Sequence, residues 1–194
     1  HTNLAIVMPS TDLGFYVNTT YGMNYFDAIA HELPKVINNF FPNLSTKREK
    51  NFIAGLSMGG YGAIRNGLKY HDTFGYIGAI SAALLTDDLH NWGEGDDLLS
   101  SRSFAQSCFG DLNKVIGSDM DPKFLIDDLI AKNIEIPKIF MAVGDNDFLY
   151  NENIDYYNYL KSRNVDVEFR CSPGEHTWEF CNDYIKEFIE WLPL

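Results

Sequence analysis

Short apolar runs alternate with longer amphipathic stretches along this chain, which is the pattern of an α/β protein. The apolar runs have the length of buried strands, and the stretches between them place apolar residues near the helical period. Strands are predicted at residues 4–8, 51–54, 74–83, 138–143 and 165–171. Helices are predicted at residues 25–41, 60–70, 151–163 and 178–191, with another starting at Asp121-Pro122. This alternation implies a mainly parallel sheet with helices on both faces.

Three of these segments carry more specific expectations. Residues 4–8 form a continuous apolar run ended by Pro9, which is typical of a strand buried on both faces. Residues 165–171 alternate between apolar and polar, which predicts an outer strand with one wet face. Pro34 lies inside the 25–41 helix and predicts a kink there, or a helix start nearby.

The stretch Gly55-Leu56-Ser57-Met58-Gly59 reads G-x-S-x-G between a predicted strand and a predicted helix. In that setting the motif predicts a nucleophile elbow, a sharp turn that presents Ser57. The glycines are needed because so tight a turn leaves no room for neighbouring side chains. Met58 starts the helix, so its backbone N–H is a candidate oxyanion donor. Without the strand and helix, the same letters would be only a glycine-rich turn.

A serine hydroxyl needs a positioned base, and the base needs an acid that holds its tautomer. In α/β-hydrolases these follow along the chain in the order serine, acid, histidine. Only His176 lies beyond the strand at 138–143, in a loop just before the last helix, so His176 is the predicted base. We interpret His31 and His71 as structural.

Two carboxylates follow the strand at 138–143, and either could serve as the acid. We favour Asp147, because it comes after the turn and precedes the apolar residues 148–150, which could shelter an ion pair from water. Asp145, next to Gly144, is better placed to cap the turn through its side chain.

Charge and composition exclude several other classes of function. The chain has 194 residues and a formal net charge of −12, which disfavours nucleic acid and anionic membranes as partners. No apolar run approaches the length of a membrane span. His31-Glu32 resembles the start of a zinc protease motif, but Lys35 occupies the second ligand position, so no metal or other cofactor is expected.

The cysteines Cys108, Cys171 and Cys181 are widely spaced and form no C-x-x-C pair. We interpret them as buried or half-buried free thiols, which fit a reducing compartment. The expected location is therefore cytoplasmic, and the location cannot be read from the N-terminal residues.

Residues 84–120 interrupt the strand–helix rhythm and are predicted to form a cap insertion over the active site. The aromatic loop at residues 10–25 follows a predicted strand, where α/β proteins build binding sites. Packing on a neighbouring loop explains these aromatic residues equally well. The candidate substrate-binding residues are Tyr16, Trp92 and Trp178, and Tyr21 could join a sugar or aromatic platform.

The chain resembles the tributyrin esterase branch of the esterase D family, which is related to S-formylglutathione hydrolases and to feruloyl and acetylxylan esterases. The resemblance is carried by residues 2–9, 21–25, 32–34, 40–43, 47–50 and 52–62, and by the acid and base loops at 144–150 and 174–178. It implies an α/β-hydrolase fold, a three-layer αβα sandwich, and a metal-independent carboxylesterase that prefers short acyl chains. It places Ser57, Asp147 and His176 on the nucleophile, acid and base of the family.

The departure from the family lies upstream. Members carry N-terminal strands and a His-Gly loop with a second oxyanion donor, and this chain opens directly on His1-Thr2-Asn3. We therefore expect one α/β-hydrolase domain over residues 1–194 that lacks those strands, acts on a small-molecule ester, and leaves homo-oligomer formation open. The alternatives are a feruloyl or acetylxylan esterase, and a non-catalytic remnant.

Overall fold

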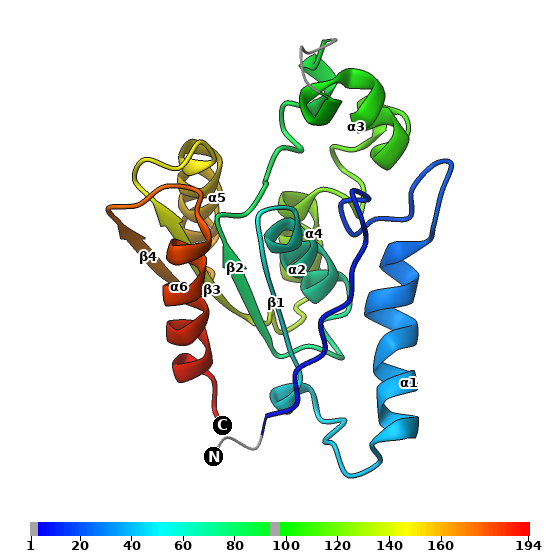
Figure 1. Ribbon diagram of the computed structural model, residues 1–194, viewed down its shortest axis with the longest axis vertical. Coiled ribbons are helices and arrows are strands. Elements are labelled where there is room, and N and C mark those ends of the chain that lie inside the picture. Colours follow the sequence, from blue (N-terminus) through cyan, green and yellow to red (C-terminus); the bar gives the residue numbers. More distant parts are fainter. Residues whose placement is uncertain (1–3, 94–97) are drawn as a thin grey trace.

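A four-stranded parallel sheet organises the computed structural model, which describes residues 4–93 and 98–194 (Figure 1). Its strands lie in the order β1-β2-β3-β4, so each strand pairs with the next one along the chain. They span β1 (Phe52–Leu56), β2 (Tyr76–Ile80), β3 (Lys138–Gly144) and β4 (Val167–Ser172). The predicted parallel sheet is confirmed, and four of the five predicted strands are present in it.

Helices cover both faces of this sheet, which confirms the three-layer α/β architecture. The helices α2 (Met58–Lys69), α4 (Pro122–Ala131) and α5 (Tyr150–Ser162) contribute to the larger apolar core on one face. Helix α6 (Trp178–Trp191) packs on the other face, around Phe140, Phe180 and Phe188. Asp121 caps α4 by accepting a hydrogen bond from the Lys123 N–H, as the Asp-Pro signal predicted.

Alternate side chains of the central strands pack into the two cores on opposite faces of the sheet, as the two-residue period of a strand requires. Ile139 and Met141 face the larger core, whereas Phe140 faces α6. Gly78 of β2 lets α6 approach closely, because a Cβ atom there would lie 2.7 Å from the Phe188 ring. The absence of a side chain at this one position therefore sets the spacing between the sheet and α6.

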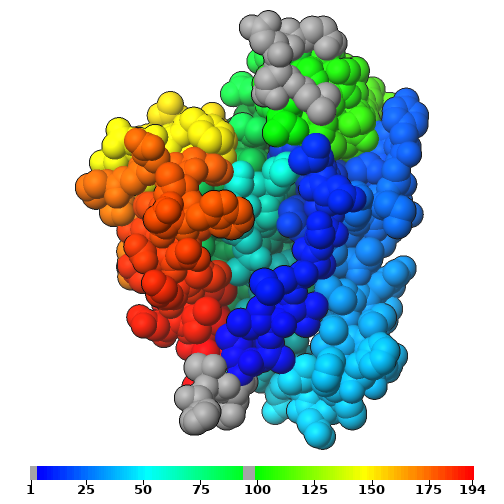
Figure 2. Space-filling model, in the orientation of Figure 1, coloured from blue at the N-terminus to red at the C-terminus, as the bar shows by residue number. Residues whose placement is uncertain are grey.

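The prediction of a buried strand at residues 4–8 is wrong. These residues form no strand, and Ile6 and Met8 are 66% and 88% exposed. Figure 2 shows the segment on the surface, between α6 and α1. An apolar run becomes a strand only when a neighbouring strand pairs with its backbone, and no strand among the described residues does so.

The predicted helix at 25–41 exists in two parts. Residues Asp27–Glu32 form a π-helical segment that continues into the α-helix α1 (Leu33–Phe40). Pro34 lies in the first two positions of α1, directly after the π-helical segment. An α-helix thus starts at Leu33, near Pro34 as predicted, but it continues a segment that is already helical.

The segment at 84–120 contains more regular structure than its pattern predicted. It includes the 3₁₀ turns Leu89–Asn91, Leu98–Ser100 and Leu112–Lys114 and the helix α3 (Arg102–Phe109), while residues 94–97 lie outside the described part. In Figure 1, α3 lies beyond the carboxyl ends of β1 and β2. The Phe15 ring packs against Phe104 and Phe109, with centroids 6.1 and 5.3 Å apart. The N-terminal loop and this segment therefore share one apolar cluster.

The outer strand β4 pairs with β3 alone, as predicted for an outer strand. Its burial does not follow the strict alternation of its sequence, because most of its residues are partly buried on either face. Tyr157 of α5 stacks on Phe169, with ring centroids 4.3 Å apart. Cys171 is exposed, which contradicts the expectation that all three thiols would be at least half-buried.

Gly78→Ala should lower the free energy of unfolding by about 1–3 kcal/mol, because the new methyl group must displace the Phe188 ring. Chemical denaturation of the purified protein measures this change. Gly93→Ala is the matched control, since nothing lies within 4 Å of a Cβ atom built at Gly93. Equal unfolding midpoints for the two variants would contradict the packing described for α6.

Candidate active site

Ser57 occupies the sharp turn between β1 and α2, in a backbone conformation with φ 55° and ψ −120°. A non-glycine residue in this region is strained, and such strain persists only where the surroundings hold it. Here the Ser57 N–H donates to the Ile80 carbonyl at 2.9 Å, and the Ala83 N–H donates to the Ser57 carbonyl at 2.9 Å. Backbone bonds to the end of β2 thus hold the turn in place.

The glycines of the motif are required by close backbone approach. A Cβ atom at Gly55 would lie 2.2 Å from the Gly59 carbonyl oxygen. At Gly60 it would lie 2.9 Å from the Cα of Ala82, the residue that follows Ser81 at the end of β2. The first turn of α2 therefore packs directly against the backbone at the end of β1 and just after β2.

Met58 is the first residue of α2, and Ser57 takes the N-cap position. The Ser57 carbonyl accepts hydrogen bonds from the N–H groups of Gly60 and Tyr61, at 2.9 and 3.1 Å. The first N–H groups of a helix have no intrahelical acceptor. The Met58 N–H is one of them, and it follows the serine directly.

Asp147 and His176 meet at the carboxyl edge of the sheet, from loops that follow β3 and β4. The Nδ1 atom of His176 lies 2.9 Å from Oδ2 and 3.1 Å from Oδ1 of Asp147. The Asp147 side chain is fully buried, and the His176 side chain is 20% exposed. A carboxylate only accepts hydrogen bonds, so Nδ1–H is the donor and Nε2 is left for another partner. In the described part of the chain, the Ser57 hydroxyl makes no hydrogen bond.

The turn that holds Asp147 is itself pinned. The Leu149 N–H donates to Oδ1 of Asp147 at 2.8 Å, and the Tyr150 N–H donates to its carbonyl at 3.0 Å. The same carboxylate therefore orients the histidine and closes its own turn, which limits the positions open to it.

Asp145 has a different set of partners. Its Oδ1 accepts from the Gly174 N–H at 3.2 Å and from the Asn146 side chain at 2.9 Å. It is exposed, and its bond to Gly174 joins the acid loop to the loop of His176. Asp145 therefore connects two loops through its side chain. This is close to the turn-capping role that its position beside Gly144 suggested.

Apolar groups lie beside the Asp147–His176 pair, as the residues after Asp147 suggested. The Phe148 ring lies 4.5 Å from the His176 ring, centroid to centroid, and Leu149 is buried. Phe148 remains 73% exposed, so it covers only one side of the imidazole. Burial, with a smaller contribution from the Asp147 carboxylate, raises the pKa of the Cys181 thiol. Cys181 is thereby kept neutral beside the acid.

The three candidate substrate-binding residues lie in different settings. Tyr16 lies across the first turn of α2: a Cβ atom at Gly62 would be 2.6 Å from its Cβ, and one at Gly59 would be 3.4 Å from its hydroxyl oxygen. Trp178 is 72% exposed, at the start of α6 and two residues after His176. Trp92 is partly buried and packs against the larger core. Tyr16 is thus beside the elbow, whereas Trp92 has a packing role.

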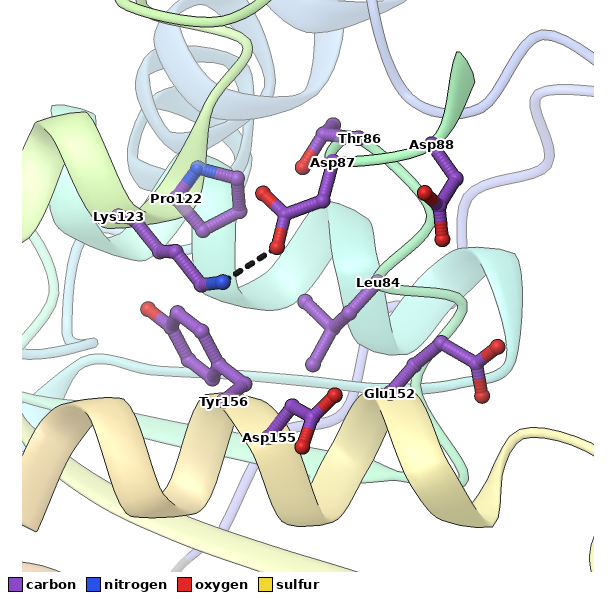
Figure 3. Close-up of a pocket in the computed structure, with 9 residues that line it drawn as sticks. All are labelled: Leu84, Thr86, Asp87, Asp88, Pro122, Lys123, Glu152, Asp155 and Tyr156. Carbon is purple, nitrogen blue, oxygen red and sulfur yellow. Dashed lines mark hydrogen bonds and ion pairs between the residues drawn. The ribbon is translucent and has the colours of Figure 1, made fainter. Parts of the chain in front are cut away.

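Two of the cavities in the described part of the chain lie near the 84–120 segment and near the His176 loop. One of about 50 Å³ lies between residues 84–88, the start of α4 and α5 (Figure 3). Its polar lining is mostly acidic, and Lys123 pairs with Asp87 across it. The other, of about 400 Å³, lies between the His176 loop and α6. Neither is lined by Ser57 or His176 in the described part of the chain.

His31 lies outside this arrangement. His31 is exposed, contacts Lys35 at 2.6 Å and stacks on Tyr70. No group of three metal-ligating side chains forms among the described residues. No helix in the same part of the chain is long and apolar enough to cross a membrane.

Sequence analysis did not single out Asn153, which lies in α5 and is completely buried. Its side chain bonds to the backbone near both the elbow and the acid turn. An asparagine at an inward position of a helix, four residues after the acid turn, was the available signal, because a buried amide must find partners.

Residues 14–193 match the family described as "Putative esterase". An acetyl esterase from Caldicellulosiruptor saccharolyticus is 41% identical over 192 residues, which are 98% of this chain and 72% of that protein. The solved structure of the Staphylococcus aureus fluorophosphonate-binding serine hydrolase FphF is similar at 37% identity and a TM-score of 0.83, covering 95% of this chain and 69% of that one.

The S-formylglutathione hydrolase FrmB of S. aureus is similar at 37% identity and a TM-score of 0.79, over 95% of this chain and 70% of that one. A ferulic acid esterase structure is similar at 25% identity and a TM-score of 0.65, over 91% and 63% of the two chains. The family match spans nearly the whole chain, including the elbow and the loops of Asp147 and His176. The chain therefore belongs to this esterase family, and it is a serine hydrolase with the α/β-hydrolase fold.

Proposed function

We propose that the protein hydrolyses short-chain acyl esters through an acyl-enzyme intermediate formed on Ser57. The observation that carries this proposal is the hydrogen bond between Asp147 and His176, at the same sheet edge as the strained turn of Ser57. The carboxyl ends of parallel strands meet at one edge, so β1, β3 and β4 each deliver one member of the triad.

In this mechanism, Nε2 of His176 accepts the Ser57 hydroxyl proton as the oxygen attacks the ester carbonyl. Asp147 holds the tautomer with Nδ1–H and stabilises the imidazolium that forms. The Met58 N–H, at the start of α2, donates to the developing oxyanion. His176 then returns the proton to the leaving alcohol, and water repeats the sequence to release the acid. The Ser57 hydroxyl makes no hydrogen bond in the described part of the chain, and a serine–histidine bond often tightens only when substrate is bound.

The acyl group is proposed to be short, from acetyl to butyryl. The 41% identical relative is an acetyl esterase, which supports this assignment. The described part of the 84–120 segment is rich in aspartate and glycine and contains no long apolar stripe that could cradle a lipid tail.

A feruloyl or acetylxylan esterase is the second candidate. The similarity to a ferulic acid esterase structure favours it, together with the position of Tyr16 across the first turn of α2. An aromatic ring beside the elbow, and the exposed Trp178, could stack on a feruloyl ring or a sugar. The two candidates share one mechanism and differ only in the substrate that they hold.

The proposed domain includes the 84–120 segment as a cap and further strands paired with β1. The support for additional strands is the outer edge of β1, where no described strand pairs and Ala54 is exposed, and the exposed apolar residues of α1 and residues 6–8. Such strands would also supply a loop for the second oxyanion donor. We further propose a cytoplasmic location, because the three free cysteines suit a reducing compartment.

Ser57→Ala should lower kcat for a short-chain chromogenic ester by at least about 10⁴-fold, because no nucleophile remains. Its unfolding midpoint should match the wild type, since alanine fits the same turn. The measurement is steady-state hydrolysis of p-nitrophenyl acetate by the full-length protein. Activity above a trace level in the folded variant would remove Ser57 from its role.

Asp147→Asn should lower kcat by about 10⁴-fold, because the amide favours the wrong tautomer of His176. Asp145→Asn is the matched control, one turn away. It should lose no more than about tenfold, the equivalent of one ordinary hydrogen bond. A larger loss from Asp145→Asn than from Asp147→Asn, with both variants folded, would reverse the choice of acid.

The rate profile across acyl lengths should peak between acetyl and butyryl and fall steeply for octanoyl and palmitoyl esters, because the described part of the 84–120 segment has no long apolar stripe to hold a long chain. Values of kcat/KM for a p-nitrophenyl series measure this, with methyl ferulate and acetylated xylan tested alongside. Ser57→Ala supplies the background rate. Faster cleavage of palmitate than of butyrate would contradict the proposal, and a preference for methyl ferulate would select the second candidate.

A further inference from the structure

Asn153 joins two backbone segments inside the larger core. Its Oδ1 accepts from the Ala82 N–H at 3.1 Å, and its Nδ2 donates to the Ala82 carbonyl at 2.9 Å. Nδ2 also donates to the Leu149 carbonyl at 2.8 Å. The side chain is 0% exposed, so no water competes for these three bonds.

One end of this connection reaches the nucleophile turn. Ala82 precedes Ala83, whose N–H holds the Ser57 carbonyl at 2.9 Å. Ala82 also supports the first turn of α2, where a Cβ atom at Gly60 would lie 2.9 Å from its Cα and Cβ. The segment is held in a left-handed conformation at Ser81, with φ 45°. The two bonds from Asn153 to Ala82 hold this strained segment in place.

The other end reaches the acid turn. Leu149 accepts from Asn153 through its carbonyl and donates through its N–H to Oδ1 of Asp147 at 2.8 Å. Asn153 is therefore connected to Ser57 through Ala82 and Ala83. It is connected to Asp147 through Leu149. Each link is a hydrogen bond or a peptide bond, so the connection allows little change in length.

Only an amide of this length meets all the requirements at position 153. It must accept from one backbone N–H and donate to two carbonyls. Aspartate would place a carboxylate against two carbonyl oxygens, and leucine would leave the buried Ala82 N–H unpaired. The Ala82 and Leu149 carbonyls would each lose one of two bonds, keeping those from the Leu84 and Asn153 N–H groups. The site thus selects asparagine by donor and acceptor count, in the interior of a helix where asparagine has no intrinsic advantage.

We propose that Asn153 is a positioning residue for ester hydrolysis, which fixes the Asp147 turn relative to the Ser57 turn. This inference rests on the proposed triad. Asn153 touches neither substrate nor reacting atoms, and it acts through Asp147. Displacement of a catalytic group by about 1 Å can cost about 10²-fold in rate. Loss of the amide should therefore lower kcat and leave KM nearly unchanged.

The test is a double-mutant cycle on kcat in the full-length protein. Asn153→Ala should lower kcat by about 10- to 100-fold, with KM within about threefold of the wild type. In the Asp147→Asn background, the same change should lower kcat by less than about threefold, because the distance between the two turns matters little once the carboxylate is gone. Full additivity of the two effects, or a wild-type kcat in folded Asn153→Ala, would overturn the proposal.

Leu160→Ala is the matched control for lost stability. Leu160 is also fully buried on α5, but at its far end, away from Ala82 and Leu149. It should lower the unfolding midpoint and leave kcat unchanged below that midpoint. Asn153→Ser, whose smaller side chain leaves room for a bridging water, serves if Asn153→Ala does not fold. Failure of both variants to fold would assign Asn153 to stability alone and reject the positioning role.

A proton NMR measurement separates this proposal from the proposed function. The Nδ1–H proton of His176, bonded to the Asp147 carboxylate, should give a far-downfield resonance in the wild type and in Leu160→Ala. It should broaden or disappear in the Asn153 variants, whether or not an ester is hydrolysed. If the wild type is inactive but its Nδ1–H resonance still depends on Asn153, the proposed function is refuted and the positioning role of Asn153 stands. An unchanged resonance in folded Asn153→Ala would refute the positioning itself.

Discussion

The structure depends on how closely the backbone of β1 approaches the first turn of α2. At Gly55 and Gly59 the two segments leave no space for a Cβ atom, and at Gly60 the helix rests on the segment after β2. This contact forces the chain to reverse direction within one residue, and Ser57 takes up the strain with a positive φ. The bonds from Ile80 and Ala83 then hold a conformation that the isolated peptide would not keep.

The acid and base are held by a different device, a set of loop-to-loop bonds. Asp147 gives one oxygen to both His176 and the Leu149 N–H, while Asp145 ties the neighbouring loop through the Gly174 N–H. The two nearby carboxylates thus have different roles: the buried Asp147 orients the imidazole, and the exposed Asp145 joins the loops. A buried carboxylate is costly unless it is fully hydrogen-bonded, which explains why its turn is so closely tied.

Above this edge, the N-terminal loop and the 84–120 segment are packed as one unit. Thr20 donates its N–H to the Ser107 carbonyl at 3.0 Å, and Phe15 fits among the aromatic rings of α3. Below them, Tyr61 donates to the Met120 carbonyl, and Arg65 bonds to Asp119. Burial opposes the ionisation of Asp119, but Arg65 and Lys69 hold its pKa below the usual value. The far end of the segment is therefore anchored to α2, the helix that starts at the elbow.

The local signals in the chain were sufficient for the sheet, most of the helices and the candidate triad. Motif, strand and helix are local properties, and the order serine, acid, histidine leaves His176 as the only base beyond β3. Residues 4–8 were misjudged because an apolar run records a tendency, whereas a strand requires a neighbour that pairs with it. The helix α3 lacked a sustained period and forms through aromatic contacts with a loop far away in the sequence. The role of Asn153 was missed for a similar reason: its position in the helix indicated a buried amide, but its partners Ala82 and Leu149 come together only in the folded chain.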